Sequence, residues 1–338
     1  MSDDVEGPDA ADIEAPDAGA PAGPRRPGLA ARIVPWVVAL ACFGYLGWKL
    51  NGAAAREDMT LLPYLLSVFA DVPWLTWLAL MIPYSAFFFL IDSLVVWRVI
   101  NWFNAPVRYI DILPIRGSSY ILSIINEQVG KGAMALYLNR RHGIPGWEVG
   151  SSMLFIMFCE FYYLLSWGLV GWIFQRDALP EVFGAIPTIA VIAYLAFPVL
   201  LAIFHGKIGG RTGLSERPLL KAFRESKASQ YVTIIILRSP ALIAAVFVYT
   251  IALRLFGVEG VSFGYMLGVL PVIFFGAATP TPMRAIAIMI WVELFPGYEG
   301  QMTAFGFVQH NFFIFFNAAI GLLFLRRANR ELFEGSAG

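Results

Sequence analysis

The stretch IINEQVGKGAM, residues 124–134, places four polar side chains and two glycines directly after an apolar run. A second break, AATPTPMR at residues 277–284, follows another apolar run. Backbone that leaves the helix at membrane depth is tolerated only where protein or water surrounds it. The fold therefore depends on whether each break turns the chain back or merely interrupts a crossing.

Composition identifies the class of protein. Hydrophobic residues make up 58% of the 338 residues and charged residues only 14%, against about 25% charged residues in soluble domains. We therefore expect an all-α, polytopic membrane helix bundle with no large soluble domain and no nucleic-acid partner. The two cysteines, Cys42 and Cys159, lie in apolar runs and are interpreted as packing residues.

Six apolar segments are candidates for full crossings, since a crossing needs about 20 residues. They are 33–50, 74–100, 147–174, 184–204, 231–256 and 302–325. Two further pieces, 110–126 and 262–278, stop at the polar and proline-rich breaks.

Basic residues gather in loops that we expect to share the cytoplasmic side. They precede the first span, follow the last, fill 207–227, and follow the second span as Arg98, Arg108 and Arg116. These loops share one side only if six segments cross while 110–140 and 262–295 form re-entrant hairpins from opposite faces. Opposed breaks of this kind are typical of transporters with inverted repeats.

Eight ordinary spans with kinks are the alternative. That arrangement would not keep all of the base-rich loops on one side of the membrane. Both arrangements leave the two termini in the cytoplasm.

The ends of the chain differ from its body. Residues 1–24 are acidic, lack Lys and Arg, and are rich in Pro, Gly and Ala, a composition that cannot bury enough apolar surface to fold. We predict a disordered cytoplasmic tail at 1–30, a membrane domain at 31–328 and a short cytoplasmic tail at 329–338.

Several ionisable side chains lie inside apolar segments, where each costs about 2.5–3.5 kcal/mol on insertion scales and so needs a partner or a function. They are Asp92, Glu160, Arg238, Arg284 and Glu293. The last span also has a small, polar face made of Gly306, His310, Asn317 and Gly321.

We interpret part of this set as the lining of a polar cavity that binds substrate. The predicted lining residues are Asp92, Glu160, Arg238, Arg284, His310 and Asn317. The alternative is that they only form hydrogen bonds between helices.

The first break offers substrate contacts of its own. We expect Asn126, Glu127 and Lys131 to contact a lipid head group, together with Arg284 from the second break. For Lys131 the alternative is a plain anchor at the cytoplasmic surface, where anionic lipids attract basic residues.

Motifs for enzymatic chemistry are weak. VGKG at 129–132 ends like a phosphate-binding loop, but Ile125 and Gly132 stand where that loop needs Gly and Ser or Thr. The three histidines lie far apart and lack metal-ligand spacing. We therefore predict no catalytic residues, no cofactor and no metal site, and do not favour an enzyme.

The order of features at 126–160 carries a family resemblance. It runs from Asn126 through a Gly-Lys-Gly turn at 130–132 and the segment NRRHGIP to Ser151, Ser152 and Glu160. This order resembles the flippase-like transmembrane region of the lysylphosphatidylglycerol synthase family. PTPMR at 280–284 stands at the place of that family's second turn, whereas Val129 and Phe161 replace its usual Pro and Arg.

The resemblance would cover about residues 30–328. It implies a bacterial inner-membrane protein that moves, or helps move, a phospholipid or lipid-linked molecule between leaflets, with an anionic lipid as the expected partner. Because the soluble synthase domain of longer members is missing, aminoacyl transfer is not expected. Two alternatives remain open: a non-catalytic membrane partner of a lipid- or polysaccharide-assembling machine, and a membrane transferase that acts on a lipid.

Overall fold

The computed structural model describes residues 29–123, 127–208, 217–278 and 284–333. Within these ranges the chain forms helices and no strand, as the composition predicts. The α-helices are α1 (Leu29–Arg56), α2 (Leu61–Ala70), α3 (Trp74–Phe103), α4 (Tyr109–Ser123), α5 (Glu127–His142), α6 (Gly146–Gln175), α7 (Ile186–Phe204), α8 (Lys221–Glu225), α9 (Ala228–Leu255), α10 (Phe263–Ala278), α11 (Ala285–Leu294) and α12 (Glu299–Phe333). Two 3₁₀ helices, η1 (Glu181–Ala185) and η2 (Pro218–Leu220), precede α7 and α8.

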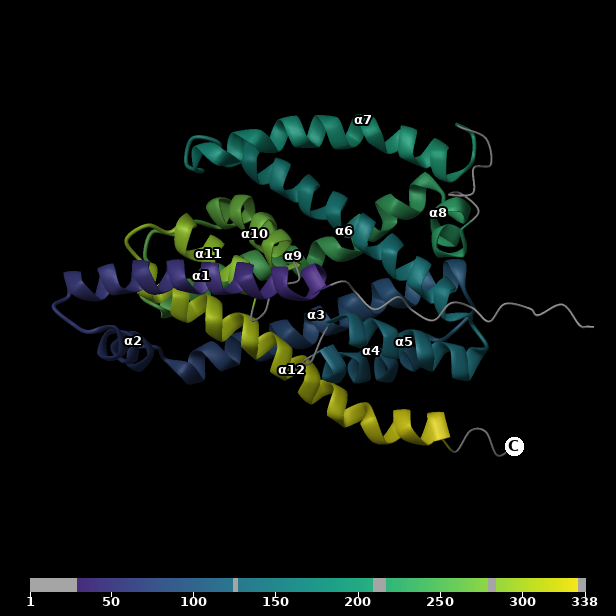
Figure 1. Ribbon diagram of the computed structural model, residues 1–338, viewed down its shortest axis with the longest axis horizontal. Coiled ribbons are helices and arrows are strands. Elements are labelled where there is room, and N and C mark those ends of the chain that lie inside the picture. The colour runs from purple at the N-terminus through teal and green to yellow at the C-terminus, as the bar shows by residue number, and fades with distance from the viewer. Residues whose placement is uncertain (1–28, 124–126, 209–216, 279–283, 334–338) are drawn as a thin grey trace, which may run out of the picture.

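Six long helices run along the molecule in alternating directions. In Figure 1, α1, α6 and α9 run toward one end, and α3, α7 and α12 run toward the other. Each of the six predicted spans overlaps one of these helices. Five helical segments of the described part are long and apolar enough to cross a membrane, namely α3, α6, η1 with α7, α9, and α12 as far as Leu323. The predicted first span, in α1, is not among them and stays a prediction.

The four shorter helices beside the two breaks form two antiparallel pairs. α4 and α5 lie together in the half of the molecule where α3 ends and α6 begins (Figure 1). α10 and α11 lie together in the opposite half, where α9 ends and α12 begins. At 15, 16, 16 and 10 residues, each helix is shorter than the roughly 20 residues that a crossing needs. The pairs therefore have the geometry of two opposed re-entrant hairpins, whose vertices lie outside the described residues.

The order span, hairpin, span occurs twice, in α3–α6 and in α9–α12, and the two units run in opposite directions (Figure 1). Each hairpin packs on the other unit, since α4 lies against α12 and α10 lies against α6. Both contacts are made through glycines. A Cβ on Gly321 would collide with the Gly117 carbonyl oxygen, and a Cβ on Gly171 would collide with the Gly268 backbone. Small residues of this kind let membrane helices approach backbone to backbone.

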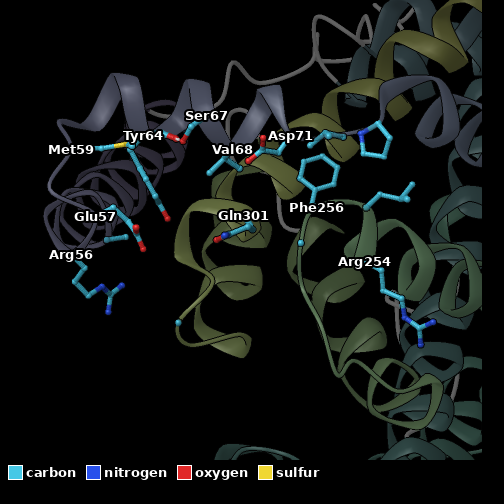
Figure 2. A pocket seen from close by; sticks show the side chains of 16 residues that line it. Arg56, Glu57, Met59, Tyr64, Ser67, Val68, Asp71, Arg254, Phe256 and Gln301 are labelled. Atoms are coloured by element: carbon cyan, nitrogen blue, oxygen red, sulfur yellow. Dashed lines mark hydrogen bonds between the residues drawn. The ribbon is translucent and has the colours of Figure 1, made fainter.

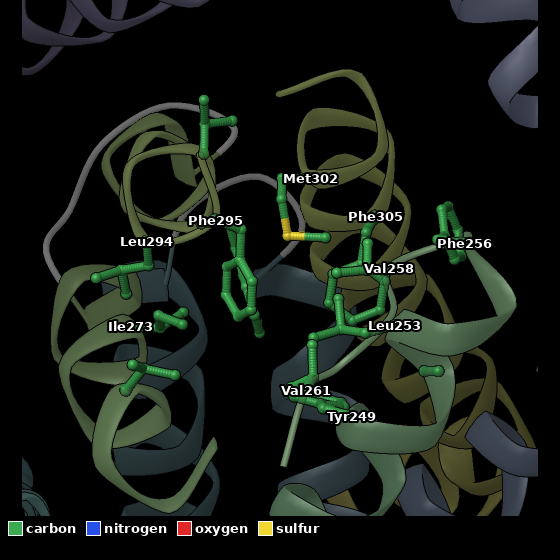
Figure 3. Close-up of a cluster of buried hydrophobic side chains, with 14 of the residues drawn as sticks. Tyr249, Leu253, Phe256, Val258, Val261, Ile273, Leu294, Phe295, Met302 and Phe305 are labelled. Carbon is green, nitrogen blue, oxygen red and sulfur yellow. The ribbon is translucent and has the colours of Figure 1, made fainter. Parts of the chain in front are cut away.

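Two large hydrophobic clusters make up most of the core, and each holds one hairpin. A small third cluster joins Ala39 and Cys42 of α1 to Ala285 of α11. Figure 3 shows part of the larger cluster, in which Tyr249, Ile273 and Phe305 belong to α9, α10 and α12. The other large cluster includes Ile112 of α4 and Leu138 of α5. Each hairpin is therefore anchored by apolar packing as well as by its glycine contact.

α7 is the least buried of the long helices. Only Ala190 is buried on it, whereas Ile189, Ile192 and Leu195 are among its exposed apolar side chains. A helix that is apolar and exposed on most sides is expected where lipid surrounds it.

The predicted tails fall mostly outside this description. The acidic segment at 1–30 reaches the described residues only at its last two positions. At the other end α12 continues through Phe333, so the helix extends past the predicted start of a tail at 329.

Candidate functional site

Four charged side chains from four helices form one continuous network inside the bundle. Asp92 of α3 accepts a hydrogen bond from Arg116 of α4, with 2.6 Å between Oδ2 and Nε. Its other oxygen lies 3.5 Å from Nη2 of Arg238 on α9. Arg238 in turn donates through Nη1 to Oε1 of Glu160 on α6, at 3.0 Å. Positive and negative side chains alternate along this network, and their four charges sum to zero.

At the Asp92 end of the network, the buried carboxylate has several hydrogen-bond and ion-pair partners. Tyr120, one turn after Arg116 on α4, donates to the same Asp92 oxygen at 2.7 Å. Asp92 is 5% exposed and Arg238 8% exposed. Burying such charges costs several kcal/mol each unless partners and hydrogen bonds offset the lost hydration. With two arginines and a hydroxyl around it, the Asp92 carboxylate has the partners that burial requires.

Glu160 is the open edge of the network. Its side chain is 36% exposed, whereas that of Asp92 is 6% exposed. Within the described part of the chain, Arg238 is the one side chain that pairs with Glu160. The network therefore ends in a carboxylate that a polar ligand can reach at the depth of a span.

A second polar cluster lies between α3, α9 and α12. The rings of Tyr84 and Tyr249 pack edge to face, with 5.6 Å between their centroids, and Gln309 donates through Nε2 to the Tyr249 hydroxyl. His310 is 3% exposed, and its Nε2 has no partner among the described residues. A buried polar atom of this kind is rare and points to an ordered water or a ligand.

Arg284 lies beside this second cluster. Gly306 of α12 packs against Ile288 of α11, and the two helices are antiparallel neighbours. Arg284 comes one turn before Ile288, while His310 comes one turn after Gly306. The two side chains therefore lie at the same level, and the Arg284 charge acts on both His310 and Tyr249.

The backbone of Arg284 is unusual as well. It has φ 52° and ψ 39°, the left-handed conformation that residues other than glycine rarely adopt. Residues held in this way cost about 1–3 kcal/mol and gather at functional sites. In the described part of the chain no carboxylate pairs with Arg284.

The predicted lining residues therefore fall into two groups. Asp92, Glu160 and Arg238 are in direct contact, and Arg284 and His310 belong to the second cluster. Asn317 lies two turns beyond His310 on α12, is 4% exposed, and has an Oδ1 without a partner among the described residues.

The remaining predicted residues behave differently. Asn126 lies outside the described residues, as do the side chains of Glu127 and Lys131, although both belong to α5. Glu293 is half exposed and bonds to Tyr45 and Lys49 of α1, so it joins two helices at the surface.

The structure corrects the interpretation of Arg116. Its position after the second span predicts a basic residue of a cytoplasmic loop, but its side chain is 17% exposed and bound to Asp92. Nothing in the sequence marks Tyr120 as a partner of Asp92. The position of Arg116 within the apolar piece 110–126 could have indicated that it is buried, because a charge in such a segment needs a partner.

No group of three or more His, Cys, Asp or Glu side chains in the described ranges could hold a metal ion. Comparisons with protein-family models, curated proteins and solved structures find no match. What the site does must therefore be argued from its own geometry.

Proposed function

We propose that this protein moves a phospholipid or a lipid-linked molecule between the two leaflets of a membrane. The observation that carries the proposal is the buried network of Asp92, Arg116, Arg238 and Glu160, with its exposed edge at Glu160. Charges inside spans are costly and commonly mark a substrate or ion pathway. A single ion pair would suffice to join two helices, whereas this network joins four and remains open at one end.

The opposed hairpins support the same proposal. A head group must cross about 30 Å of hydrocarbon, which requires a polar route partway through the bundle. Each hairpin contributes a cation to one of the two polar clusters, Arg116 from α4 and Arg284 at the start of α11. This paired placement fits a substrate that is handed from one half of the protein to the other.

Arg238 is the residue assigned to hold the substrate. An arginine binds phosphate oxygens through two parallel N–H groups, and its charge persists when it is buried. A phosphate arriving at the exposed edge would compete with Glu160 for Arg238, while Asp92 keeps the guanidinium in place from behind. Release of the phosphate would restore the Arg238–Glu160 pair.

The decisive variant is Arg238→Gln, because Asp92 keeps Arg116 and Tyr120 and the fold should survive. In liposomes with fluorescent anionic phospholipid, we expect the rate of transfer between leaflets to fall about tenfold or more, the loss expected for charged hydrogen bonds. The matched control is Arg176→Gln, which removes an exposed arginine at the end of α6. Equal transfer by wild type and Arg238→Gln, or no transfer by wild type with several lipids, would overturn the proposal.

The resemblance to the lysylphosphatidylglycerol synthase family supports a bacterial inner membrane as the location and an anionic or lipid-linked molecule as the substrate. The basic stretches at 139–143 and 221–227, which lie beside α5, α6 and α8, support cytoplasmic termini. A non-catalytic partner of a lipid- or polysaccharide-assembling machine would instead tolerate charge-neutral changes at both Glu160 and Arg284.

A further inference from the structure

Polar contacts hold α6 against α9 around the charged network, and not all of them involve Glu160. The Tyr163 hydroxyl donates to the backbone oxygen of Arg238 at 3.3 Å, and Trp167 Nε1 donates to Ser239 Oγ at 2.9 Å. The ion pair of Glu160 with Arg238 lies on the same side of α6, at 3.0 Å. Because the first two contacts use neither the carboxylate nor the guanidinium, Glu160 can leave Arg238 while the two helices stay together.

Arg238 has a hydrogen-bond donor that no described residue uses. Its Nε is buried and has no partner among the described residues, and the residue as a whole is 8% exposed. Its Nη2 lies 3.5 Å from Asp92, which is held in turn by Arg116 and Tyr120. A buried donor without an acceptor costs free energy, which an anion with several oxygens would recover. The guanidinium is therefore a preformed anion site that Glu160 occupies only in part.

The charge of the network limits how an anion can replace Glu160. The two carboxylates and two arginines sum to zero when Glu160 is ionised. A phosphodiester carries a single negative charge, so its arrival beside an ionised Glu160 would leave two anions sharing the Arg238 guanidinium. A neighbouring like charge favours the neutral form of a carboxylic acid, and an unpaired charge inside a span is costly. Protonation of Glu160 removes both costs and returns the sum to zero.

The groups nearest to Glu160 leave Arg238 as its partner. Arg238 reaches it from α9, with Asp92 of α3 on the other side of the guanidinium. The charge of Glu160 also acts on Cys159 and Tyr163, its neighbours on α6. Neither of these side chains carries a positive charge, so Glu160 would lose its cation when an anion binds Arg238.

The other helices packed against α6 at this level are α5, α7, α8 and α10. Their described titratable side chains are exposed or bond to groups other than Glu160. The exposed ones are Arg140 and His142 of α5 and Arg224 and Glu225 of α8, and the bonded ones are Tyr137 and Arg141 of α5, Tyr194 of α7, Lys221 of α8 and Tyr265 of α10.

The cavity shown in Figure 2 is a separate feature. It measures about 520 Å³ and is lined by the links on either side of α2 and by the end of α9, including Arg254 and Phe256. Arg254 comes about four turns after Arg238 on α9, and Glu160 is not part of the lining. The exposed edge of the network at Glu160 is therefore reached by another route.

We infer that Glu160 binds a proton whenever an anionic phosphodiester binds Arg238, so that lipid and proton move together. The inference rests on the proposed function for the identity of the anion. On binding, a proton from the aqueous phase forms an O–H bond with the Glu160 carboxylate. On release that bond breaks, the proton returns to water, and Glu160 pairs with Arg238 again. The network is neutral in both states, so each transfer moves a lipid anion and a proton and carries no net charge.

The first experiment measures proton uptake during lipid binding. Purified full-length protein in non-ionic detergent, weakly buffered and containing a pH-indicator dye, receives short-chain phosphatidylglycerol, whose phosphodiester stays ionised through the neutral range. Short-chain phosphatidylcholine, which carries no net charge, is the comparison. We expect saturable binding of phosphatidylglycerol by calorimetry, uptake of about one proton per lipid, and an affinity that falls by up to about tenfold per pH unit as the pH rises.

The decisive variant is Glu160→Gln, whose side chain is neutral at every pH. It should bind phosphatidylglycerol without taking up a proton, and its affinity should not change with pH. The matched control Glu181→Gln removes an exposed carboxylate of η1 outside the network, and it should take up a proton as the wild type does. Wild-type binding without proton uptake, or a Glu160→Gln variant that melts like the wild type and keeps the pH dependence, would refute the inference.

A second experiment separates this inference from the proposed function. In liposomes, a pH difference should concentrate fluorescent phosphatidylglycerol in the leaflet that faces the more alkaline solution, whereas a potassium diffusion potential should not, because no net charge moves. Transfer that leaves the lipid evenly distributed despite a pH difference would overturn the coupling and leave the proposed function standing. Proton-linked binding without any transfer would keep the proton site and overturn the proposed function.

Discussion

Asp92 can be recognised in the sequence as a charge inside a span, but only the structure identifies the side chains that stabilise it. Its place in FFFLIDSLVVW signals a charge in an apolar span, and the cost of such a charge predicts a partner. The partners come from 24 residues away on α4 and from much farther away on α9. Arg116 and Arg238 therefore depend on the same carboxylate, which makes Asp92 the central member of the network.

The substitution Asp92→Asn should destabilise the protein strongly. It removes the carboxylate that Arg116 and Arg238 share, and breaking a buried charge pair commonly costs about 3–5 kcal/mol. Glu160→Gln should cost less than about 1 kcal/mol, because that side chain is over one-third exposed. Thermal melting of the purified variants in micelles measures both. Similar melting of the two variants would mean that Asp92 is not the centre of the network.

At the scale of helices, glycine contacts decide which elements pack together. The spacing of small and polar residues places Gly321 on the small, polar face of the last span, and Gly117 follows Arg116 directly. The structure brings these two glycines together, so part of the predicted polar face is a packing surface for α4. The equivalent contact of Gly171 with Gly268 joins the other hairpin to α6.

The substitution Gly321→Ala should loosen α4 from α12. Its new methyl group would meet the Gly117 carbonyl, and overpacking of this kind costs about 1–3 kcal/mol. Hydrogen exchange should become faster in α4, with little change in α10. The control is Gly44→Ala in α1, where a Cβ would meet no atom within 4 Å. That control should be neutral, or slightly stabilising because alanine favours the helix. A variant at Gly321 with wild-type exchange in α4 would refute the close contact.

At the scale of the whole molecule, the two hairpins lie in opposite halves and each packs on the other span–hairpin–span unit. Neither half can therefore be complete without the other, because α4 needs α12 and α10 needs α6. Movement of one unit against the other would change the surroundings of both polar clusters together. This arrangement suits the proposed transfer of a substrate between halves.

Side-specific labelling tests this topology. In a variant without Cys42 and Cys159, single cysteines at Pro106, in the link between α3 and α4, and at Arg140, near the end of α5, should be labelled from the same side of the membrane, because a re-entrant hairpin enters and leaves on one side. A cysteine at Glu259, in the link between α9 and α10, should be labelled only from the other side. Labelling of Pro106 and Arg140 from opposite sides would favour eight full spans and would overturn the hairpin arrangement.

The sequence by itself determined the class, the long helices and the two breaks, because apolar length and the cost of charge in hydrocarbon are local properties of the chain. It also identified Asp92, Glu160 and Arg238, since a charge in an apolar run is visible without any structure. Only the tertiary structure decided that Arg116 completes their network and that His310 and Arg284 lie apart from it, because pairing depends on which helix faces which.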